Sequence, residues 1–170
     1  MNIFVLNPDP EKAASMLCDC HVRKMCLETA QILSACMVIR DIPLASDMPN
    51  PMSIHHPVIK AIDDSAKLDW VLLYNVYLHN EYYKRFGKAH AYNVLCSEYS
   101  KDMWDNEVTP GSDDWSVSAC YGLYPCVGDM STFGLDVVEA YRKYYVEEKK
   151  PILAGKNLWK FTKREDWTNG

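Results

Sequence analysis

The spacing of apolar residues constrains the fold of this chain more than any other feature of its sequence. In two long stretches apolar side chains recur every three or four residues, which gathers them on one face of an α-helix. Only the short run Asn2–Leu6, followed by Asn7 and Pro8, has the character of a buried strand or extended arm. The sequence therefore predicts a mainly α fold, a single-domain helical bundle with one short N-terminal extended arm. The periodic positions are Val22, Met25, Cys26, Thr29, Ile32, Leu33 and Cys36, then Leu68, Val71, Leu72, Asn75, Val76, Leu78 and Tyr82.

Capping and helix-breaking residues set the expected bounds of the helices. Asp9 followed by Pro10 is a typical helix start, and Asp19 offers a second start after a break. Pro57 opens another helical region, which Gly87 ends. We expect helix from Pro10 to about Arg40, a loop over Asp41–Ile54, helix from Ser65 to Gly87, helix over Ala89–Trp104, an irregular stretch over Asp105–Gly134 and a last helix over Leu135–Glu148.

Length and charge narrow the class of protein. With 170 residues and 19.5 kDa, the chain is expected to form one domain over residues 1–170. We expect no membrane span and no secretion signal, and we place the chain in the cytoplasm with its seven cysteines reduced. The net charge of −5 removes the simplest argument for nucleic-acid binding, but the 18 Lys and Arg residues can still cluster on one face.

The densest group of polar residues lies between Cys18 and Glu28. On a helix His21, Lys24, Glu28 and Gln31 follow one another at steps of three or four, so they form one row beside the apolar stripe. A Lys and a Glu in such a row can act as an amine nucleophile and its general acid or base. The alternative is a solvated helix face with one ordinary ion pair.

Cysteines crowd the same segment, which raises the question of a metal site. Structural zinc sites take Cys pairs two to four residues apart with a second pair further along, and Cys18, Cys20, His21 and Cys26 do not follow that spacing. We therefore expect no metal and no cofactor, and we expect the fold to survive a chelator.

Three further groups of residues are candidates for a site. His56 precedes a helix start, where the helix dipole favours a neutral imidazole that can accept a proton, although it can also simply cap the helix. Cations gathered at a helix end can bind phosphate, and cations interleaved with aromatic rings suit an unpaired DNA strand. The candidate phosphate and DNA contacts are Arg85, Lys88 and His90 at the helix end and Arg142, Lys160 and Arg164 in the C-terminal part.

Four blocks of the sequence resemble a family of small proteins encoded by bacteriophages. The blocks are D-x-H-V-x-K-M-x-L-E-T-A-Q (Asp19–Gln31), H-P (His56 and Pro57), E-Y-x-x-R-x-G-K-x-H (Glu81–His90) and A-Y-R-x-Y-Y-x-x-E-K (Ala140–Lys149). The layout of an early helix with a His and a later H-P helix start also resembles pyrimidine-dimer DNA glycosylases of the endonuclease V type. The resemblance implies DNA as a partner and the cytoplasm of an infected host cell as the location.

Two departures from the resembled families bear on the mechanism. The phage family has Lys where this chain has Cys20, and the dimer glycosylases use the amine of the residue after Met1, which here is Asn2. Asn2 is too large for efficient removal of Met1, so Lys24 is the better candidate for an amine nucleophile. We therefore expect a DNA glycosylase-like or lyase-like enzyme acting on a pyrimidine base, with His21, Lys24, Glu28 and His56 as catalytic residues and Arg85 and His90 nearby.

Two other functions fit the same sequence. One is an amino-acid:DNA transferase that takes part in the hypermodification of thymine. The other is a non-catalytic, acidic phage protein that binds a host protein through its carboxylates. The discriminating observation is whether the histidines and Lys24 converge on one site or are dispersed.

Overall fold

The computed structural model describes residues 3–93, 119–123, 136–149 and 159–161, and this part of the chain is helical. Within these ranges there is no β-strand, so the expectation of a mainly α fold is confirmed. No helix in the same ranges combines the length and apolarity of a membrane span. The helices are α1 (Pro10–Ser15), α2 (Asp19–Ile39), α3 (Pro57–Ala61), α4 (Ser65–Phe86) and α6 (Val137–Tyr144), the last followed by a π-helical turn over Tyr145–Lys149.

The break between α1 and α2 lies where the second start signal predicted it. Asp9 caps α1, since its Oδ1 accepts hydrogen bonds from the backbone N–H groups of Glu11 and Lys12 at 2.9 and 3.4 Å. The helix ends at Met16, and α2 begins after Cys18, whose extended backbone makes it the N-cap. Two separate helices thus replace the single long one that periodicity alone favours.

Helix α4 starts and ends at the predicted residues, with Asp64 as an N-cap that the sequence did not single out. Asp64 caps α4 by accepting a hydrogen bond from the backbone N–H of Lys67 at 2.8 Å. At the other end Gly87 adopts φ +68°, a left-handed conformation that glycine reaches without steric cost. The stretch between α2 and α3 contains turns and no helix, as its prolines predicted.

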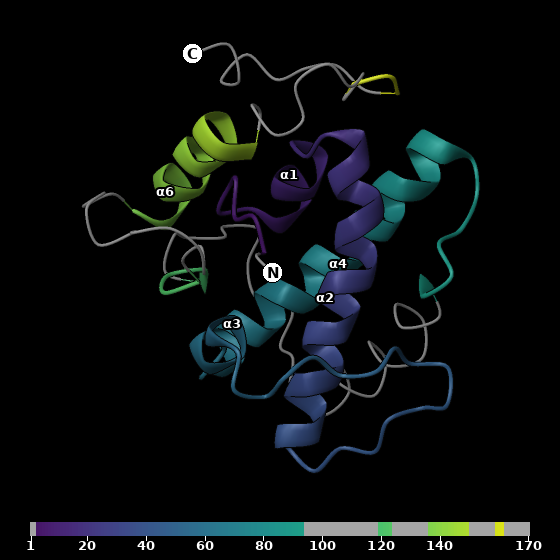
Figure 1. Cartoon of the computed structure of the whole chain (residues 1–170), viewed down its shortest axis with the longest axis vertical. Helices are drawn as coiled ribbons and strands as arrows, with labels where there is room; N and C mark the ends of the chain where they lie inside the picture. Colours follow the sequence, from purple (N-terminus) through teal and green to yellow (C-terminus); the bar gives the residue numbers. More distant parts are fainter. Residues whose placement is uncertain (1–2, 94–118, 124–135, 150–158, 162–170) are drawn as a thin grey trace.

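Helices α2 and α4 form the centre of the fold and cross each other, with α1 packed on α4 and α3 beside α2 (Figure 1). The buried face of α4 carries Trp70, Tyr74 and Leu78, all without exposed area. From α2 the fully buried Met25 and Ile32 join the same core cluster. The stripe predicted for α2 is buried throughout. On α4 the predicted Leu72 and Val76 are only partly buried, and the core residues Trp70 and Tyr74 lie outside the predicted stripe.

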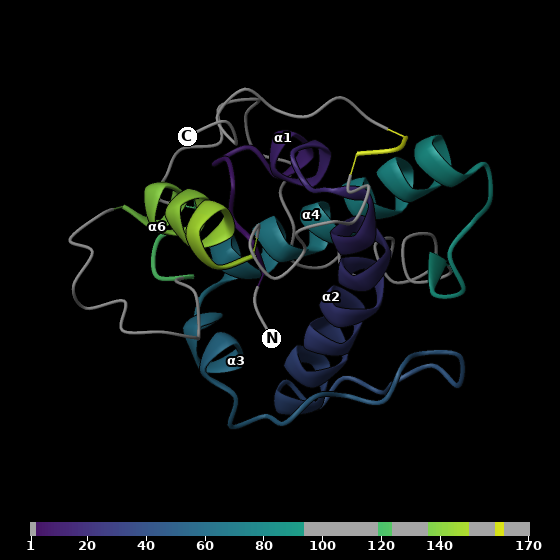
Figure 2. The same ribbon diagram turned by 45° about the horizontal axis from the view of Figure 1, so that its top comes forward.

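The N-terminal segment runs between α4 and α6, as Figures 1 and 2 show. Residues 3–6 are buried, and the backbone carbonyl of Leu6 accepts a hydrogen bond from Arg142 Nε at 2.9 Å. On the other side the hydroxyl of Tyr74 donates to the carbonyl of Phe4 at 3.5 Å. Phe4 has φ +61°, which is strained for a bulky residue, and this kink explains why the arm does not form a regular strand.

One predicted helix is not present where the structure describes it. The chain after Gly87 forms a turn, in which the Nδ1 of His90 accepts a hydrogen bond from the backbone N–H of Tyr92 at 3.4 Å. The prediction of helix from Ala89 is therefore wrong for residues 89–92, and the remainder of that helix lies outside the described residues. Of the irregular stretch over 105–134, the structure describes 119–123, which form a turn.

Candidate active site

Lys24 and Glu28 lie on adjacent turns of α2 and form an ion pair. The distance from Lys24 Nζ to Glu28 Oε1 is 3.1 Å. The two side chains differ in exposure: 57% of the Lys24 side chain is accessible to solvent, against 12% for Glu28. Glu28 Oε2 is buried and has no hydrogen-bond partner among the described residues. A buried carboxylate oxygen without a partner is costly in a folded protein, so this atom is a candidate for contact with a substrate.

His21 faces a cluster of aromatic rings. Its Nδ1 lies 2.8 Å from the hydroxyl oxygen of Tyr145, and its ring stacks on Phe4 with 4.9 Å between the ring centroids. The Tyr145 hydroxyl also accepts a hydrogen bond from the backbone N–H of Cys18 at 3.0 Å. Sequence reasoning identified His21 but missed Phe4 and Tyr145, because these partners come from opposite ends of the chain. The cluster holds the first turn of α2 in place. Lys24 lies further along the same helix.

His56 serves as the N-cap of α3. Its Nδ1 accepts a hydrogen bond from the backbone N–H of Val58 at 3.2 Å, which is the capping alternative that the sequence left open. Burial and, second, the positive charge of the chain's amino terminus lower the pKa of His56. The pKa of His56 is thus lowered in the expected direction, but by burial and the amino-terminal charge, and its Nδ1 is engaged by the cap.

Arg85 is buried, and the structure corrects its assignment as a phosphate contact. Only 2% of its side chain is exposed, and its guanidinium forms salt bridges with Asp19 at 3.3 Å and Glu81 at 2.8 Å. Two further hydrogen bonds, at 2.6 and 2.7 Å, go to the backbone carbonyls of Leu17 and Ser15. All three guanidinium nitrogen atoms donate hydrogen bonds to groups of the protein. Arg85 thereby joins α4 to the turn between α1 and α2.

The other predicted DNA contacts lie in different surroundings. Lys88 is exposed just beyond α4, and Lys160 is exposed with its Nζ 5.2 Å from the centroid of the Phe161 ring. Arg142 is half-buried and holds the N-terminal arm through the carbonyl of Leu6. Arg164 lies outside the described residues. His56 caps α3, Arg85 is enclosed beside the α1–α2 turn, and His90 packs against Tyr82 of α4.

The end of α2 near Lys24 carries a basic and aromatic surface that the sequence did not single out. The Arg23 guanidinium carbon lies 4.6 Å from the centroid of the Phe86 ring, and Phe86 packs edge-on against Phe161 at 5.3 Å. The backbone N–H of Phe161 donates to Asp19 Oδ2 at 2.9 Å, which ties this part of the chain to the start of α2. Arg23, Lys24 and Lys160 are exposed, and Phe161 is 47% exposed.

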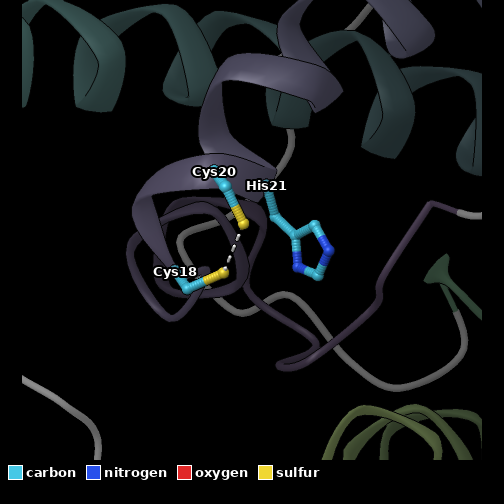
Figure 3. A group of neighbouring side chains, drawn as sticks. All are labelled: Cys18, Cys20 and His21. Carbon is cyan, nitrogen blue, oxygen red and sulfur yellow. Dashed lines mark hydrogen bonds between the residues drawn. The ribbon is translucent and has the colours of Figure 1, made fainter. Parts of the chain in front are cut away.

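Within the part of the chain that the structure describes, two groups of cysteine and histidine side chains come close enough to consider a metal. In the first, Cys18, Cys20 and His21 gather at the first turn of α2, with the two sulfur atoms 3.3 Å apart and the imidazole beside them (Figure 3). The hydrogen bond from Cys20 is the main cause that lowers the pKa of Cys18 to about 4. The second group is Cys26, His79 and His90. Burial and, second, the charge of His90 lower the pKa of His79 to about 4.

Comparison with known proteins identifies the family of the chain. Residues 1–93 match the family model described as pyrimidine dimer DNA glycosylase. Comparisons with curated proteins and with solved structures gave no significant match. The matched region contains α1 to α4, the Lys24–Glu28 pair and His56. Because this match spans more than half of the 170 residues, the chain belongs to the pyrimidine dimer DNA glycosylase family.

Proposed function

We propose that this protein removes a damaged pyrimidine base from DNA by a glycosylase and lyase reaction, with Lys24 as the amine nucleophile and Glu28 as its proton acceptor. The observation that carries the proposal is the Glu28 carboxylate within the family region. One of its oxygen atoms is 3.1 Å from the Lys24 amine, and the other is buried without a partner among the described residues. A nucleophile next to a base is the arrangement that such catalysis requires.

The reaction starts with a proton transfer between these two side chains. The Lys24 ammonium passes a proton to Glu28, and the neutral amine then bonds to C1′ of the deoxyribose while the bond from C1′ to the base breaks. The base leaves as an anion and takes up the proton from Glu28. Loss of a second amine proton and opening of the C1′–O4′ bond give an imine between Lys24 and the sugar, with the oxygen protonated to a hydroxyl. Removal of a C2′ proton then expels the 3′ phosphate, and water hydrolyses the imine.

The surface beside this pair supports DNA as the partner. An enzyme that attacks a pyrimidine within a duplex must extrude a nucleotide, and the opened strand needs cations for phosphate and rings for stacking. Arg23, which precedes Lys24 in the sequence, and Lys160, which precedes Phe161, are exposed cations, and the half-exposed Phe161 supplies a ring tied to the start of α2. These charges allow DNA binding despite the net charge of −5.

The substrate is tested by incubating the full-length protein with unmodified, ultraviolet-irradiated and hydroxymethyl-pyrimidine DNA. Mass spectrometry of the released bases and the remaining nucleosides measures the outcome. We expect strand breaks at pyrimidine lesions in irradiated DNA, with one C1′–base bond of the lesion cleaved, and no change in unmodified DNA. Nucleosides that gain the mass of an amino acid would contradict the proposal in favour of a transferase. The absence of any change in all three DNAs would contradict it in favour of a non-catalytic binder.

A further inference from the structure

His79 is a buried histidine whose ring nitrogens have no hydrogen-bond partner among the described residues. The residue lies on α4 and is 3% exposed, and both Nδ1 and Nε2 are enclosed. Burying two polar nitrogen atoms without partners destabilises a fold, so such a group calls for a physical explanation. A ligand that binds imidazole nitrogen is one explanation, and the neighbours of His79 indicate which ligand.

Two other metal-binding side chains stand beside His79. Cys26 comes from α2 and His90 from the turn after α4, and one ligand atom from each of the three residues lies within 4.8 Å of the others. The rings of His79 and His90 are 5.5 Å apart at an interplanar angle of 70°. The Cys26 thiol donates a hydrogen bond to the backbone carbonyl of Leu78 at 3.5 Å, which holds the sulfur next to His79.

We propose that Cys26, His79 and His90 bind a Zn²⁺ ion that connects α2, α4 and the turn after α4. One thiolate and two imidazoles match the ligand preference of zinc, and a water molecule can complete the tetrahedron. Zinc bonds of ordinary length place ligand atoms about 3.3 to 3.6 Å apart, so only small side-chain movements from the present arrangement are needed. On binding, the Cys26 sulfur loses its proton to solvent and bonds to the metal.

The surroundings of the three residues suit the binding of an ion from solution. The three side chains come from two helices and the turn after α4, and their ligand atoms already lie within 4.8 Å of one another. His90 is partly exposed and gives an entry path from solvent, while Cys26 and His79 are buried. A bound ion also occupies the unpaired nitrogen of His79, which removes part of the cost of its burial.

The other group, Cys18, Cys20 and His21, already has hydrogen-bond partners within the protein. Its two sulfur atoms already interact at 3.3 Å, and the Nδ1 of His21 is engaged by the Tyr145 hydroxyl. His79 is thus distinguished by ring nitrogens that lack a partner within the described ranges. The zinc site is separate from the proposed chemistry, because its side chains are not the Lys24 and Glu28 of the reaction. Its role is to fix α2 against α4.

The test uses the full-length protein without an affinity tag, stripped of metal by a chelator and then dialysed. Zinc binding is measured by competition with a chromophoric chelator, and Co²⁺ binding by absorption, because a thiolate ligand gives a sulfur-to-cobalt charge-transfer band. We expect one Zn²⁺ per chain, a rise in Tm on adding zinc, and the cobalt band. The variants Cys26→Ser and His79→Gln are expected to weaken zinc binding at least tenfold and to abolish the rise in Tm.

Matched variants keep the outcome interpretable. Cys36→Ser removes another buried thiol from α2 and is expected to leave zinc binding unchanged. His90→Gln changes the partly exposed ligand and tests the site if the two buried variants fail to fold. Less than stoichiometric zinc in the parent protein would overturn the proposal. So would a cobalt band that survives Cys26→Ser, or one that is lost with Cys18→Ser and Cys20→Ser instead.

Discussion

Glu28 is the residue on which the proposed chemistry depends most directly. Its carboxylate is nearly enclosed, while its partner Lys24 is more than half exposed. The pair therefore stabilises the fold only modestly, since a partly exposed ion pair on a helix contributes at most about 0.5 kcal/mol. A change at Glu28 that preserves its shape should thus affect the reaction far more than the stability.

The first prediction concerns this carboxylate. Glu28→Gln keeps the size of the side chain but removes the proton acceptor, so we expect excision from irradiated DNA to fall by about 10²- to 10⁴-fold. Circular dichroism should show an unchanged fold. The control is Glu11→Gln, which changes an exposed carboxylate in the first turn of α1 and should retain full activity. An active Glu28→Gln enzyme would exclude Glu28 as the general base.

At the scale of the secondary-structure elements, Arg85 joins α4 to the turn between α1 and α2. It pairs with two carboxylates and donates to two backbone carbonyls, all within a nearly closed environment. A buried charge of this kind is held by its partners, and removing it leaves the buried Asp19 carboxylate without its counter-charge, while Glu81 keeps only the exposed Lys84. We therefore expect the loss of Arg85 to lower the stability of the fold and to disturb the position of α2, and not to act through phosphate binding.

The second prediction follows from this contact. Arg85→Met should lower the free energy of unfolding by about 3 to 5 kcal/mol, because the buried Asp19 carboxylate and two backbone carbonyls lose their partner. Denaturation with urea, followed by circular dichroism, measures the change. Lys84→Met, at an exposed neighbour on the same helix, should change stability by less than about 0.5 kcal/mol. A stable Arg85→Met protein that had lost only its affinity for DNA would restore the phosphate-binding interpretation.

The elements differ in how far the sequence could predict them. Capping residues such as Asp9, Asp64 and Gly87 act on their own neighbours, so the bounds of α1 and α4 followed from local rules. The turn at residues 89–92 did not, because Ala89 and Ala91 have high intrinsic helix propensity. The kinked arm at Phe4 depends on packing between α4 and α6, which no local pattern contains.

The candidate site shows the same division between local and distant contacts. Lys24 and Glu28 are four residues apart on one helix, so their pairing could be predicted from spacing. The contact between His21 and Tyr145 and the group formed by Cys26, His79 and His90 join distant parts of the chain. Spacing rules compare neighbours in the sequence, which is why they gave no reason to expect a metal.

At the scale of the whole molecule, the family match and the site lead to one mechanism. The match covers α2, the helix that carries Lys24 and Glu28, and the start of that helix is tied to the half-exposed Phe161, which follows the exposed Lys160. An amine that attacks C1′ must pass through an imine with the opened sugar. Borohydride reduces that imine to a stable bond between protein and DNA, which makes the intermediate measurable.

The most direct test is therefore to trap the full-length protein on ultraviolet-irradiated DNA with borohydride and to identify the linked residue by mass spectrometry. The account predicts a covalent adduct at Lys24 that disappears in Lys24→Arg, which retains the charge but cannot supply a neutral amine. Lys84→Arg, the same change at an exposed lysine paired with Glu81, should still form the adduct. An adduct at the N-terminal amine, or one that persists in Lys24→Arg, would contradict the assignment of Lys24. The absence of an adduct on irradiated DNA would contradict amine catalysis itself.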